Sequence, residues 1–240
     1  MKVLMIIPAY NEENSIVSTV KSLEKAELTD DILDYIIIND GSTDKTKEVC
    51  LKNNLNVINL PVNLGIGGAV QTGYKYARDN NYDIAIQFDG DGQHDATYIK
   101  TLVDEIKKGN DIVIGSRYVE ELSEFKSTFI RRIGIRFLSF LIKICTGKKI
   151  YDPTSGFRAS NKDIINMFAK DYPTDYPEPD TIVTVIKSGY KVSEVPVKMK
   201  ERISGKSSLS SPIKATFYMI KVSFAIIISS MTSRRVKNAK

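Results

Sequence analysis

Short runs of β-branched and other apolar residues alternate with helical patterns through the first half of the chain. Strand, helix and strand in repeated succession form crossover units, which give a mostly parallel sheet covered by helices on both faces. The sequence therefore predicts an α/β fold. The predicted strands are residues 3–7, 35–38, 57–60, 84–88 and 112–114, and the predicted helices between them are residues 15–25, 43–52, 67–78 and 97–107.

Polar residues and glycines follow every one of these predicted strands. In parallel sheets, ligands bind beyond the carboxyl ends of the strands. Five consecutive strand ends with such clusters predict a ligand site at that edge of the sheet. The clusters are residues 10–12, 39–44, 63–68, 89–94 and 116–117.

The strongest local motif is Asp89-Gly90-Asp91-Gly92, directly after the strand at 84–88. Two carboxylates two residues apart on a turn loosened by glycine suit a hard divalent cation that bridges a diphosphate. Magnesium or manganese is therefore expected, although a solvated turn rich in Asp and Gly remains an alternative. An EF-hand is excluded because residues 89–100 lack its further oxygen ligands.

Glycines at residues 65–68 resemble a phosphate-binding loop, but the expected signatures are missing. No Gly-Lys-Ser/Thr follows them, and Val70 stands where a dinucleotide fingerprint needs its third glycine. We interpret the segment as a tight turn into a helix whose Ala69, Gly73 and Ala77 pack closely on the sheet.

Three residue types narrow the chemistry further. Asp40 follows the second predicted strand, where its carboxylate can accept a hydrogen bond from a base or a ribose. His94 is the only histidine, which disfavours a Ser-His-Asp hydrolase. Cys50 and Cys145 are the only cysteines and show no disulfide or zinc spacing, so a reducing cytoplasm is the expected compartment.

Two later segments are helical, apolar and basic. Residues 129–146 place Ile133, Phe137 and Ile144 on one helical face, together with Ile130 and Leu141, and carry arginines and a lysine on another. Such a helix either lies in a membrane interface or packs on a core with a solvated basic side. Residues 213–231 approach spanning length, but two lysines interrupt them, which favours an interfacial or bundle helix.

The charge balance supports a membrane surface as a partner. Lys and Arg total 34 against 29 Asp and Glu, for a net charge of +5, and the C-terminal tail adds cations next to the segment 213–231. Anionic headgroups attract such tails. We expect attachment at the cytoplasmic face of the cell membrane, peripheral or through a single C-terminal helix. Nucleic-acid binding is not expected because the basic residues lie on apolar helices, and the oligomeric state is open.

A set of motifs in fixed order resembles family 2 glycosyltransferases of the dolichyl-phosphate mannosyltransferase-like subgroup. The resemblance covers about residues 1–208 and implies a GT-A fold, a nucleotide-sugar donor and inverting transfer, as in cell-envelope glycan synthesis. The motifs are PAYNE at 8–12, NDGSTD at 39–44, NLG at 63–65, DGD at 89–91, GSR at 115–117, DPTSGFR at 152–158 and EVPV at 194–197 with Arg202.

The resemblance implies roles on the donor side. Asp89 and Asp91, with Gln93, would hold the divalent metal, and Asp89 would also contact the donor. Asp91 and Arg202 would act in catalysis by neutralising the charge on the leaving diphosphate. The nucleoside of a UDP- or GDP-sugar would lie against Pro8, Tyr10, Glu12 and Asp40.

On the acceptor side the resemblance places Arg117, Arg131 and Arg132 at an acceptor phosphate. A polyprenyl phosphate needs no protein base, because its monoester, with a second pKa of about 6, is largely a dianion near pH 7. A saccharide acceptor, free or lipid-linked, would need a carboxylate to take the hydroxyl proton, and Asp180 or Glu178 is then the candidate. Polyprenyl phosphate is the favoured acceptor.

These assignments divide the chain into functional parts. Residues 1–208 form the glycosyltransferase domain, in which 1–117 bind the nucleotide sugar and 118–208 the acceptor. Residues 209–240 form an amphipathic membrane-associating helix and a basic tail. An alternative hypothesis, from outside the enzymes, is a catalytically silent module that binds nucleotide sugars at a membrane. The intact Asp89 and Asp91 argue against it.

Overall fold

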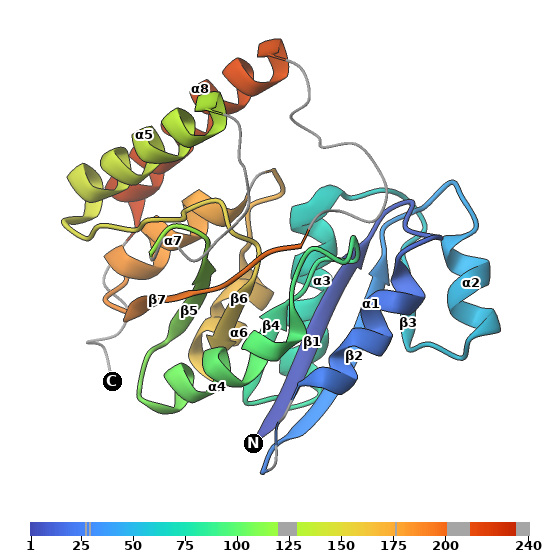
Figure 1. Cartoon of the computed structure of the whole chain (residues 1–240). Coiled ribbons are helices and arrows are strands. Elements are labelled where there is room, and N and C mark those ends of the chain that lie inside the picture. The colour runs from blue at the N-terminus through green and yellow to red at the C-terminus, as the bar shows by residue number, and fades with distance from the viewer. Residues whose placement is uncertain (27, 29, 120–128, 176, 201–211, 234–240) are drawn as a thin grey trace.

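The computed structural model describes the chain apart from residues 27, 29, 120–128, 176, 201–211 and 234–240 and the side chains of residues 129–131 and 212–215. The described residues form a seven-stranded sheet in the order β3-β2-β1-β4-β6-β5-β7 (Figure 1). The strands are β1 (Lys2–Ala9), β2 (Ile32–Asn39), β3 (Val57–Asn59), β4 (Ile84–Gln87), β5 (Ile112–Ser116), β6 (Arg158–Asn161) and β7 (Val192–Pro196).

Helices cover both faces of this sheet, as the strand–helix alternation predicts (Figure 1). Each helix expected from the sequence is present within a few residues of its expected bounds. Two short 3₁₀ helices, Leu23–Lys25 and Ala96–Tyr98, adjoin α1 and α4. The helices are α1 (Ile16–Ser22), α2 (Thr46–Lys52), α3 (Gly65–Asp79), α4 (Ile99–Lys107), α5 (Phe129–Thr146), α6 (Lys162–Lys170), α7 (Pro177–Lys187) and α8 (Pro212–Thr232).

The side-chain alternation of β1 divides the core into two layers. Val3, Met5 and Ile7 point into the layer shared with α1, α2 and α4. Leu4 and Ile6 point into the opposite layer, shared with α3 and α6 to α8. All five side chains are fully buried, as expected for a strand covered on both faces.

Strand β6 is the exception to the parallel arrangement. It runs antiparallel to both β4 and β5, between which it is inserted. Its sequence, Arg158–Asn161, has no apolar run, and the sequence pattern did not predict it. The sheet is mostly parallel, as expected, because the pairs β1–β2, β1–β4, β2–β3 and β5–β7 are all parallel.

Helices α5 and α8 lie side by side beyond the sheet, next to α7 (Figure 1). Ile133, Phe137 and Ile144, on the apolar face expected in α5, are exposed, whereas Leu138 and Ile142 pack into the core. Leu141, from the same expected face, is partly buried against the core. The helix therefore packs on the core, while Ile133, Phe137 and Ile144 stay exposed beside its basic residues. Within the described residues, no helix is both long and apolar enough to cross a membrane.

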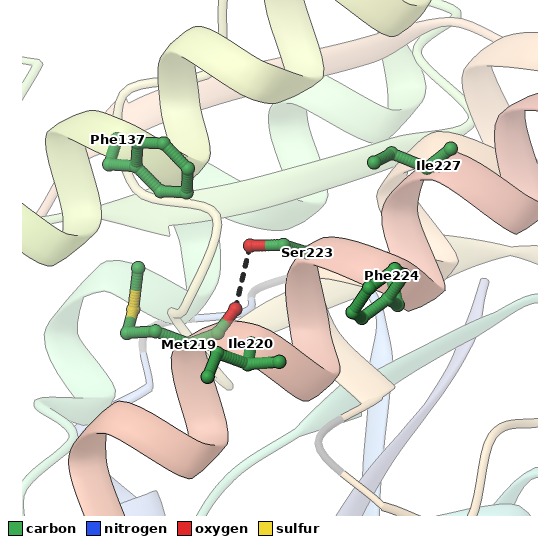
Figure 2. Close-up of a pocket in the computed structure, with 6 residues that line it drawn as sticks. All are labelled: Phe137, Met219, Ile220, Ser223, Phe224 and Ile227. Atoms are coloured by element: carbon green, nitrogen blue, oxygen red, sulfur yellow. Dashed lines mark hydrogen bonds between the residues drawn. The ribbon is translucent and has the colours of Figure 1, made fainter.

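A shallow apolar groove runs between α5 and α8 (Figure 2). The hydroxyl of Ser223, the polar side chain in its lining, donates to the carbonyl oxygen of Met219 at 2.6 Å, so the groove presents hydrocarbon and a thioether. Exposed cations lie on the same helix pair. The lining residues are Phe137, Met219, Ile220, Ser223, Phe224 and Ile227, and the exposed cations are Arg132, Arg136, Lys143 and Lys221.

Candidate active site

The loops after β1 and β2 are joined by hydrogen bonds beyond the carboxyl ends of these strands. Asn11, in a left-handed conformation with φ 58°, accepts the backbone N–H of Thr43 at 2.8 Å on its Oδ1. The N–H of Asn11 donates to Ser42 Oγ at 3.0 Å, and the N–H of Glu12 donates to Thr46 Oγ1 at 2.8 Å. These contacts hold the two loops together, and we call the joined loops the loop frame.

The predicted nucleoside residues lie along this frame. Pro8 is buried in β1, and its carbonyl accepts the N–H of Gly90 at 3.3 Å, which ties β1 to the turn that carries the two aspartates. Tyr10 is exposed at the end of the strand. The Glu12 carboxylate accepts the hydroxyl of Ser15 at the start of α1. The structure thus brings Pro8 and Glu12 beside the turn and leaves the Tyr10 ring open to solvent.

Asp40 joins β2 to the glycine-containing turn before α3. It is buried, and its Oδ1 accepts the backbone N–H of Leu64 at 2.7 Å while its carbonyl accepts from the Asn63 side chain at 3.1 Å. The next residue, Gly41, has φ +63° and lies so close to Asn63 that a Cβ would stand 2.7 Å from its nitrogen. One carboxylate oxygen of Asp40 is therefore committed to holding the turn.

The glycines of that turn are structural, as interpreted from the sequence. A Cβ on Gly67 would lie 2.0 Å from the carbonyl oxygen of Pro173, and one on Gly73 would lie 2.2 Å from Ile6 Cγ2. Ala69 and Ala77 are buried on the same face of α3. The small residues allow the helix to approach the sheet closely.

The two aspartates of the motif differ in exposure. The Asp89 side chain is 35% exposed, whereas Asp91 is buried and its Oδ1 accepts the N–H of Gln93 at 3.0 Å. The side-chain amide of Gln93 donates to the backbone carbonyl of Lys200 at 3.4 Å, and the backbone carbonyl of Gln93 accepts the Lys200 N–H at 2.8 Å. Gln93 therefore anchors the segment that leads to residue 201.

A divalent cation fits the chemistry of this donor set. In the described part of the chain, no three His, Cys, Asp or Glu side chains gather as a closed metal site. Magnesium is commonly held by one or two carboxylates and completes its shell with water and substrate phosphates. Asp89, partly open to solvent, and Asp91 are two such carboxylates on one turn, so they suit a cation that arrives with a diphosphate.

His94 is buried beneath Asp89. Its Nδ1 accepts the backbone N–H of Asp89 at 3.1 Å, so the ring proton of the neutral imidazole is on Nε2, which lies 3.6 Å from Asp89 Oδ2. The ring stacks on Phe157 with centroids 4.8 Å apart. His94 therefore supports the turn, a role that the sequence did not predict.

Arg117 forms a buried ion pair with Asp152. Its Nε and Nη2 donate to the two carboxylate oxygens at 2.7 and 2.8 Å, and Nη2 also donates to Thr154 Oγ1 at 3.0 Å. Burial alone would lower the pKa of Arg117, but the charge and hydrogen bonds of Asp152 outweigh it and raise that pKa. The pKa of Asp152 is lowered in turn, since the attraction of Arg117 outweighs burial.

This pair changes the expected role of Arg117. The sequence predicts a direct contact with an acceptor phosphate, but much of the guanidinium is occupied by Asp152 and Thr154. Asp89 is close enough to act on the charge of Arg117, so the Arg117–Asp152 pair lies near the aspartate turn. Its partner Asp152 lies 35 residues away along the chain, and the sequence carries no signal that joins them.

Arg158 is a second buried cation and was missed by the sequence analysis. Its guanidinium donates to the carbonyls of Ser155, Pro153 and Glu178 at 2.6, 3.0 and 2.8 Å and to Thr181 Oγ1 at 3.0 Å. It thereby joins the loop before β6 to the first turn of α7.

The two acidic candidates on α7 have different surroundings. Burial raises the pKa of the Glu178 carboxyl, which Arg158 lowers and Asp89 raises, so Glu178 lies within reach of both charges. Burial also raises the pKa of Asp180, but its carboxylate accepts the hydroxyl of Ser229 on α8. Asp180 thus contacts helix α8, whereas Glu178 is the α7 carboxylate that interacts electrostatically with Asp89 of the turn.

Three predicted arginines cannot be placed together. Arg202 and the side chain of Arg131 lie outside the described residues. Arg132 is exposed on α5, on the helix pair that carries the groove. The structure thus brings together Pro8, Glu12, Asp89 and Asp91, places Asp40 in the adjoining turn, and puts Arg132 on the outer helix layer.

Known proteins are similar to this chain in sequence. The family model described as "Glycosyl transferase family 2" matches residues 5–168. A UDP-N-acetylglucosamine–dolichyl-phosphate N-acetylglucosaminyltransferase of Methanococcus voltae is 32% identical over 82% of this chain and 84% of its own. A dolichyl-phosphate β-glucosyltransferase of Trichomonas vaginalis is 30% identical over 97% of this chain and 76% of its own.

Solved structures show the same fold. Glucosyl-3-phosphoglycerate synthase of Mycobacterium tuberculosis, crystallised with Mn²⁺, UDP-glucose and phosphoglyceric acid, has a TM-score of 0.70 and 19% identity, over 95% of this chain and 79% of its own. The aspartate turn at the strand ends, the mostly parallel sheet and the family match over residues 5–168 together place this chain in glycosyltransferase family 2, with a GT-A fold.

Proposed function

We propose that this glycosyltransferase moves a sugar from a UDP- or GDP-sugar to a polyprenyl phosphate at the cytoplasmic membrane surface, with inversion and with a divalent metal, in cell-envelope glycan synthesis. The observation that carries the proposal is the exposed apolar, cation-bearing layer that α5 and α8 form on the chain that also carries Asp89 and Asp91. Exposed apolar surface of this kind marks an interaction site, and the cations beside it suit anionic lipid headgroups.

On the donor side, the frame of loops around Asp40 and Glu12 would receive the nucleoside. Asp89 and Asp91 would hold magnesium or manganese, which would neutralise charge on the departing diphosphate. Arg202 remains proposed as the cation that faces the diphosphate, and Arg117, held by Asp152, remains proposed on the acceptor side. The Methanococcus voltae relative, whose name specifies a UDP-sugar donor, supports this side of the proposal.

On the acceptor side, the phosphate monoester would attack the anomeric carbon as a dianion. Arg131 and Arg132 on α5 are proposed to bind that phosphate at the water interface, and the apolar faces of α5 and α8 would lie among the lipid chains. The relatives in Methanococcus voltae and Trichomonas vaginalis are both named for dolichyl-phosphate acceptors, which supports this choice.

The position of Asp180 weakens the alternative acceptor, a saccharide hydroxyl. That reaction needs a general base within reach of the hydroxyl, and Asp180 is hydrogen-bonded to Ser229 of α8. The Glu178 carboxyl interacts with the charges of Arg158 and Asp89, but it is buried next to Arg158. We therefore assign Glu178 a structural role. We retain the division into a transferase domain, residues 1–208, with donor and acceptor halves that meet at 117–118, and a membrane-associating segment, residues 209–240.

Transfer to a defined lipid tests this function. Purified protein with Mn²⁺ or Mg²⁺, a panel of nucleotide sugars and undecaprenyl phosphate in detergent should give a glycosyl phospholipid detectable by mass spectrometry. Asp91→Asn should give none. Donor hydrolysis without a lipid product would refute the acceptor, and binding of nucleotide sugar without turnover would favour the silent module.

A further inference from the structure

Gln87, the last residue of β4, lies directly beneath the aspartate turn. Only 1% of its surface is exposed, so it cannot reach solvent or a substrate. Its side-chain Nε2 donates to Asp89 Oδ1 at 3.1 Å. Its own Oε1 is buried, and no group in the described structure donates to it. The side chain thus leaves its acceptor unsatisfied while its donor reaches Asp89.

The orientation of this amide is determined by its neighbour. In the flipped orientation Oε1 would face the Asp89 carboxylate, and two acceptors would repel each other. A buried acceptor without a partner is costly, and a residue without polar atoms would avoid that cost. The presence of an amide here, despite that cost, points to a requirement for the hydrogen bond to Asp89.

Gly156 supplies the space that this contact needs. A Cβ at position 156 would stand 2.8 Å from Gln87 Nε2 and 3.2 and 3.4 Å from the two carboxylate oxygens of Asp89. Gln87 on β4 is paired with Arg158 on β6, so Gly156 belongs to the loop that enters the neighbouring strand. A side chain at position 156 would therefore displace the amide or the carboxylate from their present positions, and glycine leaves both in contact.

His94 closes the other side of Asp89. Its Nε2 lies 3.6 Å from Oδ2, while Gln87 donates to Oδ1. Each oxygen thus has one buried nitrogen near it, and the hydrogen bond from Gln87 restricts rotation of the carboxylate. A ligand carboxylate that is already oriented loses less entropy on binding a cation.

We propose that Gln87 is a positioning residue, which orients the Asp89 carboxylate for the divalent cation through the hydrogen bond in the niche left by Gly156. The inference rests on the proposed function, because it assigns Asp89 to the metal. Partners of metal ligands typically contribute 10- to 100-fold to metal affinity. Gln87 should act on cation binding and not on contact with the sugar.

The test compares Gln87→Met with Tyr74→Phe. Methionine keeps the approximate size of glutamine but has no N–H donor. Tyr74→Phe also removes one buried hydrogen bond, the 3.1 Å contact with Ser160 of β6, without touching Asp89. Mn²⁺ binding in the presence of saturating UDP or GDP is measured by electron paramagnetic resonance of free Mn²⁺, alongside thermal unfolding of each variant.

The expected result is a 10- to 100-fold weaker Mn²⁺ affinity for Gln87→Met and an affinity within twofold of the wild type for Tyr74→Phe. In turnover, the Mn²⁺ concentration for half-maximal rate should rise for Gln87→Met, and kcat at saturating Mn²⁺ should fall less. Gln87→His, which keeps an N–H donor, should recover part of the affinity.

Two results would overturn the inference while leaving the proposed function in place. They are wild-type Mn²⁺ affinity in a folded Gln87→Met protein and an equal loss in Tyr74→Phe. A wild-type protein that binds no Mn²⁺ with either nucleotide, or an Asp89→Asn protein that binds it normally, would instead refute the metal assignment and the inference together.

Discussion

The exposed layer of α5 and α8 predicts a measurable affinity for membranes. The sharpest perturbation is the double substitution Ile220→Ser and Phe224→Ser, because both residues line the groove and are 54% and 62% exposed. Full burial of such a side chain contributes about 1.5–3 kcal/mol. Scaled by the exposed fractions, the pair should lose about 2–3 kcal/mol of membrane affinity, which is a decrease of about 30- to 140-fold in the partition coefficient.

The assay is co-flotation with vesicles that contain anionic lipid. Ile32→Ser with Leu51→Ser is the matched control, since these side chains are 60% and 56% exposed but lie on β2 and α2. The control should bind vesicles like the wild type, and all three proteins should unfold at similar temperatures. Equal vesicle binding by both double variants would refute the assignment of the membrane surface to α5 and α8.

Four further outcomes follow from the structure. Arg117→Ala should lower the free energy of unfolding by about 3–5 kcal/mol in urea titrations, because it leaves the Asp152 charge buried and unpaired; a loss below about 1 kcal/mol would contradict the buried pair. The pKa of Asp152 is lower in the folded protein than its unfolded value of 3.8. In the same urea titrations, the contribution of this carboxylate to the free energy of unfolding should therefore be complete above pH 3.8 and decline as the pH falls through the folded-state pKa. Glu178 has the opposite sign, since its pKa is raised: Glu178→Gln should unfold at a higher temperature at pH 7, with a gain that vanishes below about pH 4; a gain that persists there would disprove the assignment. Gly67→Ala should destabilise the chain by about 1–3 kcal/mol, because its Cβ would collide with the carbonyl of Pro173; an unchanged melting temperature would count against the close packing.

The fold of residues 1–117 was largely predictable because each strand there is a short apolar run bounded by polar residues. Strand β6 escaped detection because Arg158 and Ser160 break any apolar pattern. Their burial depends on acceptors supplied by the loop at 153–155 and by α7. Such a strand is stabilised by neighbours distant in sequence, which periodicity does not reveal.

The site residues also fall into those that the local sequence predicts and those that depend on contacts between distant segments. Asp89 and Asp91 were predicted because a turn motif is local in sequence. The support from Gln87 and the pairing of Arg117 with Asp152 depend on the order β1-β4-β6-β5 in the sheet, and nothing in the sequence shows which side chains that order brings together. The exposure of Ile133, Phe137 and Ile144 on α5 depends on which other face α7 and α8 cover, and the sequence does not show that.

The central claim is transfer to a lipid phosphate, and a comparison of two lipids tests it most directly. A polyprenyl phosphate and the polyprenol of the same length are offered with Mn²⁺ and the donor that the wild type uses, and the lipids are analysed by mass spectrometry. The account predicts sugar on the phosphate and none on the alcohol, because the monoester dianion is the nucleophile and the protein needs no base. Sugar on the polyprenol, or on a saccharide but on neither lipid, would contradict it.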